Sequence, residues 1–369
     1  MIKPALPESG RAAPDRLIFW LGVSLLALGA VVVFSASAHI AGQNYDRPLF
    51  FFWKQLIFFF GGLAVLILVS HVPYAFWKAN YRICLAIALA LMIVVLFMPS
   101  VRGARRWLFL GPFRLQVSEV LRFATVLFMA ATIARHKKND VGFKKQVLPY
   151  LILLGIGGIL LMLEPDLSAA LLLAGTVIAM LFFSGTSLRH IALLVMPALT
   201  AVCILVLGLG YKQDRLTNYL DGLRDPFEAA YQVKQGLIHM GAGGLLGKGL
   251  GAGMAKFLYV PDAHTDFIFA SIGEELGLVA TLLILSAYVF LFLRCLRIAR
   301  RAPDRFAALL AAGLGASLAI QSALNFGVVL GLLPPTGLPL PLLSYGGSSA
   351  LFTTAALAVV LNVSRHARA

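Results

Sequence analysis

This sequence of 369 residues has little charge, few acidic residues and few cysteines. Only 13% of its residues are Asp, Glu, Lys or Arg, whereas an ordinary soluble domain has about 25%. Its three cysteines indicate neither a disulfide framework nor a metal site built on thiolates. The phosphate-binding motif G-x-x-x-x-G-K-[ST] and the transpeptidase motif S-x-x-K are both absent. A soluble domain, a disulfide-rich secreted protein, a Walker-type nucleotide-binding protein and a serine-lysine transpeptidase are therefore not indicated.

Apolar residues are abundant, because hydrophobic side chains make up 60% of the chain and its mean hydropathy is +0.88. A transmembrane helix needs about 20 mostly apolar residues. Ten runs of this kind are present, at 17–38, 51–70, 83–99, 118–134, 147–163, 167–184, 191–210, 266–293, 306–328 and 346–363. No small-residue cleavage site follows the first run, which predicts a retained helix and not a removed signal peptide. We therefore predict an all-α polytopic membrane protein, with one ten-helix domain at 17–363 between tails at 1–16 and 364–369.

Basic residues indicate the orientation of these helices. Lys and Arg number 31 against 16 Asp and Glu, and cytoplasmic loops of membrane proteins carry an excess of Lys and Arg. The clusters RHKKND at 135–140 and RCLRIARRAPDR at 294–305 favour a topology with both termini in the cytoplasm. In this topology, residues 211–265 form a large outer loop between the seventh and eighth helices, and the cytoplasmic charge favours contact with anionic inner-leaflet lipid.

The outer loops carry more basic residues than orientation alone requires. Residues 102–114 carry four Lys or Arg, and residues 211–265 carry six. An anionic ligand at the outer face would account for them. Two alternatives to such a ligand stay open. Long loops cross the membrane regardless of charge, and these bases can pair with the neighbouring acids Asp214, Asp221, Asp225 and Glu228.

Two outer segments have compositions that disfavour regular helices. GAGGLLGKGLGAG at 241–253 has seven glycines, so its backbone can either turn N–H groups toward an anion or pack tightly against another segment. LLPPTGLPLPLLSYGGSS at 332–349 has four prolines and three glycines. Irregular backbone at membrane depth is tolerated only where it is buried in protein or lines a wet cavity. Both segments lie beside helix ends on the same predicted face, which indicates an outward-facing cavity.

Ionisable residues cluster where the eighth helix begins. The stretch PDAHTDFIFASIGEELG at 261–277 brings together Asp262, His264 and Asp266, and Glu274 and Glu275 follow inside the helix. Ionisable groups in membrane segments are costly and are a functional-site hypothesis by default. At least one of the two glutamates has to face the bundle interior and find a partner.

Other acids have a structural interpretation. Glu119 and Arg122 are spaced i,i+3 and would share one helix face, which predicts a structural ion pair. Glu164 and Asp166 lie in EPDLS between the fifth and sixth helices. A turn and helix capping account for Asp166 there as readily as ligand contact does.

Seven ordered motifs make the sequence similar to a known family. They are GARRW at 103–107, LQVSE at 115–119, EPDLS at 164–168, YQVKQGLI at 231–238, GAGGLLGKGLG at 241–251, PDAHTDFIFASIGEELG at 261–277 and GLPLPLLSYGGSS at 337–349. On these motifs the chain, over nearly its whole length, resembles the SEDS family (shape, elongation, division and sporulation). YQVKQG, GLGAGMAK and IGEELG resemble the division branch of the family more than its elongation branch, whereas LPPTGLPLP has features of both. Val117, Asp262 and Arg122 stand where Pro, Glu and Lys are more common in the family.

The resemblance implies a peptidoglycan glycosyltransferase that polymerises lipid II on the outer face of the bacterial cytoplasmic membrane, at the division septum. It implies a class B penicillin-binding protein (an FtsI-like transpeptidase) and other membrane proteins of the division machinery as partners, and no nucleic acid. It also implies that the essential acid is the Asp of the H-T-D triplet, which is Asp266 here.

The reaction itself indicates what the site must contain. Chain extension needs a base for the attacking sugar hydroxyl and positive charge for the departing diphosphate. Asp266 is the candidate base, and a single inverting displacement needs no second carboxylate. The candidate substrate-binding residues are His264, Asp262, Lys248, Lys256, Arg105, Arg106, Arg215, Ser344, Gly346 and Gly347. A divalent cation (Mg²⁺ or Mn²⁺) held by Asp266 is an alternative partner for the diphosphate, and a hydrogen-bonding role within the loop is an equal alternative for His264.

Three other functions fit parts of the pattern. A lipid II flippase would use the same cavity, but it would need polar residues across the bundle, and the helices have few of these apart from Glu274, Glu275 and Arg122. An elongation-type polymerase would perform the same reaction. A purely structural scaffold does not explain the D-A-H-T-D cluster at a basic mouth.

Overall fold

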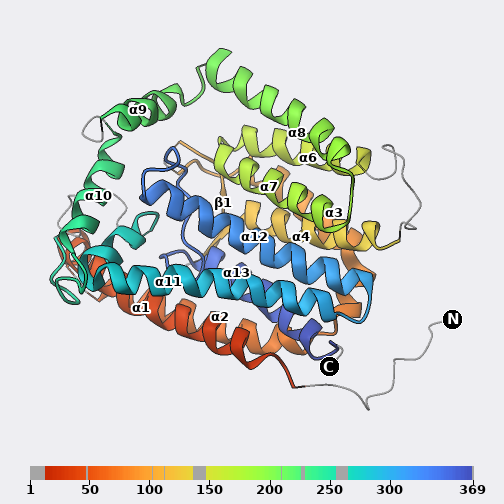
Figure 1. Cartoon of the computed structure of the whole chain (residues 1–369), viewed down its shortest axis with the longest axis horizontal. Helices are drawn as coiled ribbons and strands as arrows, with labels where there is room; N and C mark the ends of the chain where they lie inside the picture. Colours follow the sequence, from red (N-terminus) through yellow and green to blue (C-terminus); the bar gives the residue numbers. More distant parts are fainter. Residues whose placement is uncertain are drawn as a thin grey trace.

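The computed structural model of the protein describes residues 13–46, 49–101, 103–111, 113–135, 147–208, 210–225, 229–254 and 265–367. Each of the ten predicted segments forms a helix. The ten are α1 (Arg16–Tyr45), α2 (Phe50–His71), α3 (Tyr74–Val95), α4 (Val117–Ile133), α6 (Leu148–Leu163), α7 (Leu167–Phe183), α8 (Leu188–Cys203), α11 (Ile268–Arg301), α12 (Arg305–Val329) and α13 (Gly347–Ser364). Figure 1 shows them packed side by side as a bundle.

The helices have the length and hydropathy of membrane spans. Among the described residues, seven helices are long and apolar enough to cross a membrane, namely α1, α2, α3, α8 with its extension to Gly208, α11, α12 and α13. The apolar helices α4, α6 and α7 are shorter, at 17, 16 and 17 residues. The described sheet structure is one hairpin, in which β1 (Trp107–Leu110) pairs antiparallel with β2 (Phe113–Gln116). The prediction of an all-α polytopic membrane protein is therefore confirmed.

Helix boundaries differ clearly from the prediction in four places. α1 continues to Tyr45 and does not end at residue 38. α3 begins at Tyr74 and not at residue 83, because it starts directly after Pro73 and includes two basic residues predicted in a loop. α11 continues to Arg301, so that four arginines predicted in a cytoplasmic loop lie in its last turns. Long basic side chains can extend from inside a helix to the membrane surface, so their charge does not end the helix. α8 changes at Ile204 into a π-helix that ends at Gly208.

The centre of the bundle is formed by α12 and α13. In the 18-residue apolar stretch of each of these two helices, 72% of the residues are buried. In the corresponding stretch of α8 with its extension, only 11% are buried. Small residues bring α12 close to its neighbours, since a Cβ atom on Gly315 would lie 2.6 Å from Cβ of Cys295 on α11. Close packing of small residues is how helices associate in a bilayer, where burial of apolar surface supplies little driving force. α8 and its extension instead expose apolar side chains such as Leu199 and Leu207.

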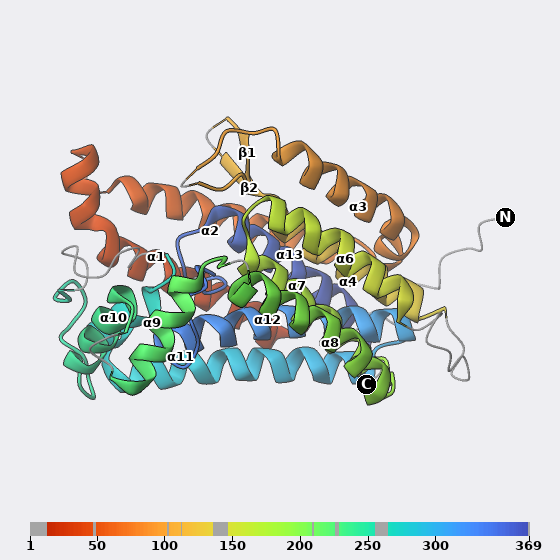
Figure 2. The same ribbon diagram turned by 90° about the horizontal axis from the view of Figure 1, so that it is seen from above.

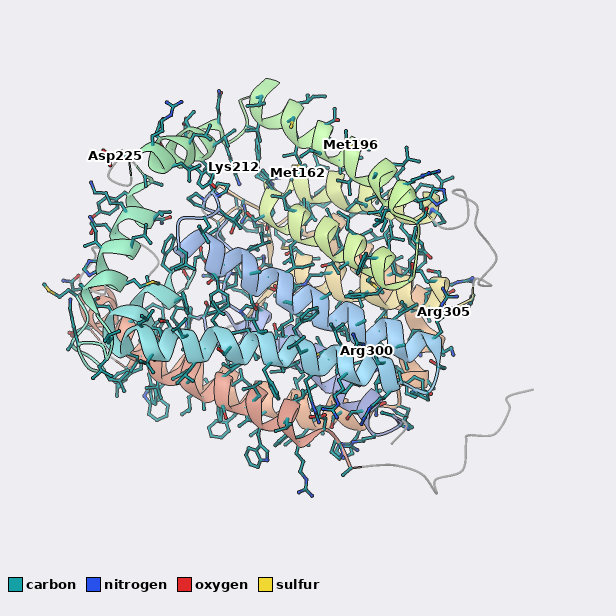
Figure 3. All side chains as sticks on the ribbon, viewed as in Figure 1. Met162, Met196, Lys212, Asp225, Arg300 and Arg305 are labelled. Atoms are coloured by element: carbon teal, nitrogen blue, oxygen red, sulfur yellow. The ribbon has the colours of Figure 1, made fainter. Side chains whose placement is uncertain are left out.

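The two ends of the bundle differ (Figure 2). One end carries the β1–β2 hairpin and the additional helices α9 (Gln213–Arg224) and α10 (Tyr231–Ala242), and we call it the loop end. Figure 3 shows Lys212 and Asp225 at the loop end, and Arg300 and Arg305 at the opposite end. The predicted outer loop at 211–265 thus contains two helices that its composition did not predict.

Hydrogen bonds between distant parts of the sequence join the first and last helices. Arg294 Nε lies 2.7 Å from Asp15 Oδ2, and the Asp15 N–H donates to Ser364 Oγ at 3.0 Å. The Tyr74 N–H donates to Asn362 Oδ1 at 2.9 Å. These contacts hold α1, α3, α11 and α13 as one unit, and this unit positions the segments at the loop end.

Candidate active site

Asp266 lies two residues before the start of α11, at the loop end of the bundle. Its backbone carbonyl accepts a hydrogen bond from Asn325 Nδ2 at 2.8 Å. Its carboxylate lies beside Gly337, where an added Cβ atom would be 3.4 Å from Asp266 Oδ2. Asp266 is half-buried, so its carboxylate lies at an accessible edge between α11 and the chain that follows α12.

Residues 330–346, the proline segment, run irregularly between α12 and α13. Proline has no N–H, so this backbone has more acceptors than donors, and its buried carbonyls need donors from elsewhere. Side chains of α7, α9, α11 and α12 supply them. From α12, Asn325 donates to the Leu338 carbonyl at 2.8 Å and Gln321 donates to the Pro339 carbonyl at 3.0 Å. From α9, Arg215 donates to the Pro335 carbonyl and Tyr219 donates to the Leu332 carbonyl, both at 2.9 Å. The hydroxyl of Ser168 on α7 donates to the Thr336 carbonyl, and that of Tyr288 on α11 donates to the Pro341 carbonyl.

Asn325 connects the proline segment to the acid. Its Nδ2 donates both to the Asp266 carbonyl and to the Leu338 carbonyl, each at 2.8 Å. Asn325 is 1% exposed, so water does not compete for these bonds. One buried amide on α12 therefore fixes the backbone of Asp266 relative to the proline segment.

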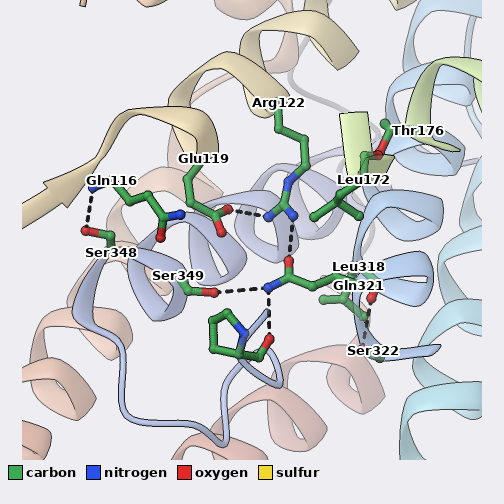
Figure 4. Close-up of polar contacts among 11 residues, drawn as sticks. Gln116, Glu119, Arg122, Leu172, Thr176, Leu318, Gln321, Ser322, Ser348 and Ser349 are labelled. Carbon is green, nitrogen blue, oxygen red and sulfur yellow. Dashed lines mark hydrogen bonds and ion pairs between the residues drawn. The ribbon is translucent and has the colours of Figure 1, made fainter. Parts of the chain in front are cut away.

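A polar network lies inside the bundle behind the proline segment (Figure 4). Arg122 and Glu119 form an ion pair, and Arg122 Nη1 donates to Gln321 Oε1 at 2.5 Å. Gln321 Nε2 in turn donates to the Pro339 carbonyl and approaches Ser349 Oγ at 3.4 Å. A buried charge requires such partners. A small cavity adjoins the pair and is lined by Glu119, Arg122, Phe123, Ser317, Phe352 and Thr353, among others.

The turn between α6 and α7 carries EPDLS. Asp166 caps α7 by accepting from the Ala169 N–H at 3.0 Å, which is one of the two roles that the sequence left open, and its Oδ2 also lies 3.4 Å from Arg106 Nε. Glu164 is fully buried, and neither of its carboxylate oxygens has a hydrogen-bond partner among the described residues. Burial and, next, the charge of Asp166 raise the pKa of Glu164 to about 8, although Arg106 opposes the shift. Glu164 is therefore mostly protonated at neutral pH.

Three cations gather at this turn. Arg106 Nη2 donates to the Pro165 carbonyl at 2.5 Å, and Lys212 Nζ donates to the same oxygen at 3.3 Å. Lys212 lies directly before α9, and Arg215 follows one turn later. Burial, followed by the charges of Arg215 and Arg106, lowers the pKa of Lys212, whereas Asp166 raises it. The three cations therefore share one electrostatic environment.

Residues 241–254, the glycine segment, direct N–H groups toward the backbone of α11. The Lys248 N–H donates to the Glu274 carbonyl at 3.0 Å. The Gly249 N–H donates to the Glu275 carbonyl at 2.9 Å. A Cβ atom on Gly243 would lie 2.0 Å from the Gly273 oxygen. Of the two interpretations that the composition left open, these contacts favour tight packing.

Glu274 and Glu275 both face the interior, and both have partners. Glu274 Oε1 lies 2.8 Å from Lys248 Nζ and 3.2 Å from His239 Nδ1. Ser35 Oγ on α1 contacts both carboxylate oxygens of Glu275, at 2.7 and 2.6 Å. The expectation that at least one of these glutamates finds a partner inside the bundle is confirmed.

The predicted substrate-binding residues are not all brought together. Lys256, Asp262 and His264 lie outside the described residues, so their roles stay predictions. Arg105 Nη1 donates to the Leu96 carbonyl after α3 at 2.9 Å, and Lys248 is paired with Glu274. Arg106 and Arg215 lie at the EPDLS turn and the proline segment, near each other.

Ser344, Gly346 and Gly347 shape the end of the proline segment. Ser344 is 3% exposed, and its Oγ accepts from the Leu340 N–H at 2.8 Å. Gly346 directly precedes α13. Gly347 packs against Phe58, whose ring would lie 2.3 Å from an added Cβ atom. The described contacts of these residues are therefore with the protein's own segments.

Sequence reasoning missed Asn325, Gln321 and Lys212. Asn325 and Gln321 are amides inside a helix that is otherwise apolar, and the cost of burying a polar group in a membrane segment is the signal that could have identified them. Lys212 stands three residues before Arg215 at the start of the predicted outer loop. The i,i+3 spacing of these two cations could have indicated a shared helix face.

In the part of the chain that the structure describes, no group of three or more His, Cys, Asp or Glu side chains is placed to hold a metal ion. Mg²⁺ is often held by one or two carboxylates together with substrate phosphates. A divalent cation at Asp266 therefore stays a prediction.

Residues 15–369 match the cell cycle protein family FTSW_RODA_SPOVE. The chain is 41% identical to the probable peptidoglycan glycosyltransferase FtsW of Thioalkalivibrio sulfidiphilus, over 93% of this chain and 88% of the relative. It is 37% identical to stage V sporulation protein E of Bacillus subtilis, over 97% of this chain and 99% of the relative. Among solved structures it is similar to a chain of a peptidoglycan synthase complex (TM-score 0.78, 28% identity, 96% and 98% of the two chains). It is also similar to RodA of Thermus thermophilus (TM-score 0.71, 26% identity, 96% and 97% of the two chains).

Proposed function

Because the chain belongs to the FtsW/RodA/SpoVE cell cycle protein family, we propose that it is a peptidoglycan glycosyltransferase. It polymerises lipid II into glycan strands on the outer face of the cytoplasmic membrane. The observation that carries the proposal is the position of Asp266, an acid held at the loop end between α11 and the proline segment. Cations gather at the same end.

In the proposed reaction, the 4-hydroxyl of one sugar attacks the anomeric carbon of a second sugar that is linked to polyprenyl diphosphate. A C–O bond forms at the anomeric carbon, the bond to the diphosphate oxygen breaks, and that oxygen leaves with the electron pair. Asp266 accepts the proton of the attacking hydroxyl, as a general base within hydrogen-bond reach does. A single displacement of this kind inverts the anomeric configuration.

Burial supports Asp266 as the base over the other acids of the bundle. Glu119, Glu164, Glu274 and Glu275 are all at most 6% exposed, and three of them are bound to a cation or a hydroxyl of the protein. Asp266 is half-buried. Among these acids it is the one that a substrate at the loop end can reach.

We also propose that the protein works at the division septum with a class B penicillin-binding protein of the FtsI type and with other membrane proteins of the division machinery. The sequence has no S-x-x-K transpeptidase motif, so a second protein has to cross-link the strands. The similarity to a chain of a complex that coordinates polymerization and crosslinking supports a partner. The relatives named FtsW support the division role over an elongation role.

The test uses the purified full-length protein, reconstituted with lipid II in the presence and absence of the partner. Asp266→Asn should lower glycan polymerisation roughly 10²–10⁴-fold. Asp221→Asn, on α9 and away from the described contacts of Asp266, should polymerise like the wild type. Both variants should keep the wild-type melting temperature.

Near-normal glycan synthesis by folded Asp266→Asn protein would overturn the assignment of the base. A wild-type protein that moves lipid II across liposome membranes but makes no glycan with its partner would overturn the polymerase and support the flippase.

A further inference from the structure

Several cations in this protein are paired with an acid. Such pairs are Arg122 with Glu119, Lys248 with Glu274, Arg294 with Asp15 and Lys78 with Asp304. Arg106, Lys212 and Arg215, which we call the cation cluster, have a single acid partner among the described ion pairs, which is Asp166 beside Arg106. All three direct hydrogen bonds at neutral carbonyl oxygens, those of Pro165 and Pro335.

The cation cluster has more positive than negative charge around it. The side chain of Asp166 lies next to it, with Oδ2 3.4 Å from Arg106 Nε. Glu164 is buried beneath the turn and is mostly protonated at neutral pH, because its pKa is raised to about 8. Asp214 and Arg215 are both exposed on the first turn of α9, where solvent and salt screen both charges, and Arg106 and Lys212 are more buried. Holding three like charges together is unfavourable unless an anion offsets them, so the cluster is suited to binding one.

The cluster lies close to the proposed base. Arg215 donates to the Pro335 carbonyl, and Asp266 lies beside Gly337, two residues further along the proline segment. The hydroxyl of Ser168 holds the carbonyl of the intervening Thr336. Two residues span at most about 7 Å, so the cluster and the carboxylate can act on one bound molecule.

We propose that the cation cluster binds the diphosphate of the polyprenyl-linked donor, with Lys212 between the two arginines. This inference rests on the proposed function. When the bond from the anomeric carbon to the diphosphate oxygen breaks, that oxygen keeps the electron pair and the leaving group gains one negative charge. The cluster stabilises this charge more strongly in the transition state than in the bound substrate. Arg105, which reaches the Leu96 carbonyl after α3, and Lys248, which pairs with Glu274, lie outside the cluster.

The composition of the cluster predicts which anion it prefers. Guanidinium groups bind phosphate oxygens through two parallel hydrogen bonds, whereas an ammonium acts as a compact point charge. Two guanidinium groups with an ammonium between them offer more donors than one phosphate can use. The cluster should therefore prefer a diphosphate to a monophosphate.

Binding is tested on the full-length protein in nanodiscs of a zwitterionic lipid, with farnesyl diphosphate, farnesyl monophosphate and inorganic diphosphate as probes. Farnesyl diphosphate should bind more tightly than the monophosphate, and inorganic diphosphate should compete with it. Lys212→Gln should weaken the binding of farnesyl diphosphate roughly ten- to hundred-fold, because it removes a hydrogen bond between charged groups. Lys212→Arg should restore most of the affinity, which separates loss of charge from loss of fold.

Arg224→Gln is the matched control, since it removes the same charge from the other end of α9, where Arg224 is exposed. It should bind farnesyl diphosphate like the wild type. A Lys212→Gln protein that binds as tightly as Arg224→Gln would overturn the proposed site.

Polymerisation kinetics separate this inference from the proposed function. Lys212→Gln should raise the KM for lipid II and make its dependence on salt shallower. Glycan synthesis by the wild type, with KM and probe affinity unchanged in Lys212→Gln, would overturn the diphosphate site and leave the polymerase function standing. A wild type that binds the diphosphate through Lys212 but makes no glycan with its partner would support the site and overturn the polymerase function.

Discussion

The glycine segment and the proline segment are both irregular and both lie at the loop end, but they are held in opposite ways. In the glycine segment, backbone N–H groups donate hydrogen bonds to carbonyls of the α11 backbone, as those of Lys248 and Gly249 do. The proline segment is short of N–H groups, and its carbonyls accept from side chains that reach it from four helices. Close backbone contact therefore determines the first segment, and individual side chains determine the second.

This difference predicts how substitutions affect each segment. At Gly243 and Gly247 of the glycine segment an added methyl group meets backbone atoms, which cannot rotate away, so single substitutions at these two positions should disturb the fold. In the proline segment the loss of one donor leaves one carbonyl without a partner, at a cost of about 1–3 kcal/mol. Substitutions there should leave a folded protein whose site geometry has changed.

The largest effect is expected for Gly243→Ala. Its Cβ atom would lie 2.0 Å from the Gly273 oxygen and 2.9 Å from Glu274 Cα, so α10 and α11 would have to separate. The free energy of unfolding should fall by more than about 3 kcal/mol, measured as monodisperse yield and melting temperature in detergent. Gly241→Ala is the control, because no atom lies within 4 Å of its added Cβ. Equal melting temperatures for the two variants would show that backbone contact does not hold this segment.

Asn325→Asp should have the next largest effect. The aspartate keeps the shape of the side chain but has no N–H to donate, so the Asp266 and Leu338 carbonyls lose their partner. Because a small displacement of a catalytic group can slow a reaction about 10²-fold, kcat for glycan polymerisation should fall by about that factor while KM for lipid II changes less.

The control for this variant is Ser322→Ala, a buried residue on the same helix whose hydroxyl bonds only to Leu318 of its own helix at 2.9 Å among the described contacts. Its kcat should match the wild type. Folded Asn325→Asp protein with a wild-type kcat would contradict the positioning role of Asn325.

The smallest effect is expected for Glu164→Gln, at the turn that meets the proline segment. The pKa of Glu164 is raised from 4.5 to about 8, so the stability that this acid contributes is fully present below about pH 4.5 and is lost as the pH rises toward 8. Glutamine does not ionise. Between about pH 5 and about pH 9 the wild type should therefore lose roughly 1–3 kcal/mol of stability relative to the variant, measured as melting temperatures across that range. Parallel pH profiles for the two proteins would contradict the raised pKa.

The sequence predicted the positions of the helices because a long apolar run in a bilayer has to satisfy its own backbone, and a helix does so. It did not predict where α3 begins or where α11 ends, since Lys and Arg side chains can extend to the membrane surface from within a helix. The identity of Asp266 as the candidate acid came from the H-T-D motif. Its support by Asn325 could not be predicted, because the bond depends on the path of the proline segment, and no sequence spacing gives that path.

Arg105 and Arg106 show why neighbouring basic residues could not be told apart. Both were predicted to contact the substrate. They lie in the extended chain that leads into β1, where successive side chains point to opposite sides. Arg105 turns back to Leu96 after α3, and Arg106 reaches Pro165 at the EPDLS turn.

The hydrogen bond from the Asp15 N–H to Ser364 can form only at the end of biosynthesis, because its two residues are 349 positions apart. At a synthesis rate of about 5–20 residues per second, roughly 17 to 70 s pass between the emergence of these residues from the ribosome. The partners of Ser35 and Asp15 are made one after another during that interval, first Glu275, then Arg294 and last Ser364. The first helix therefore acquires its last polar contact only when the final helix has been inserted.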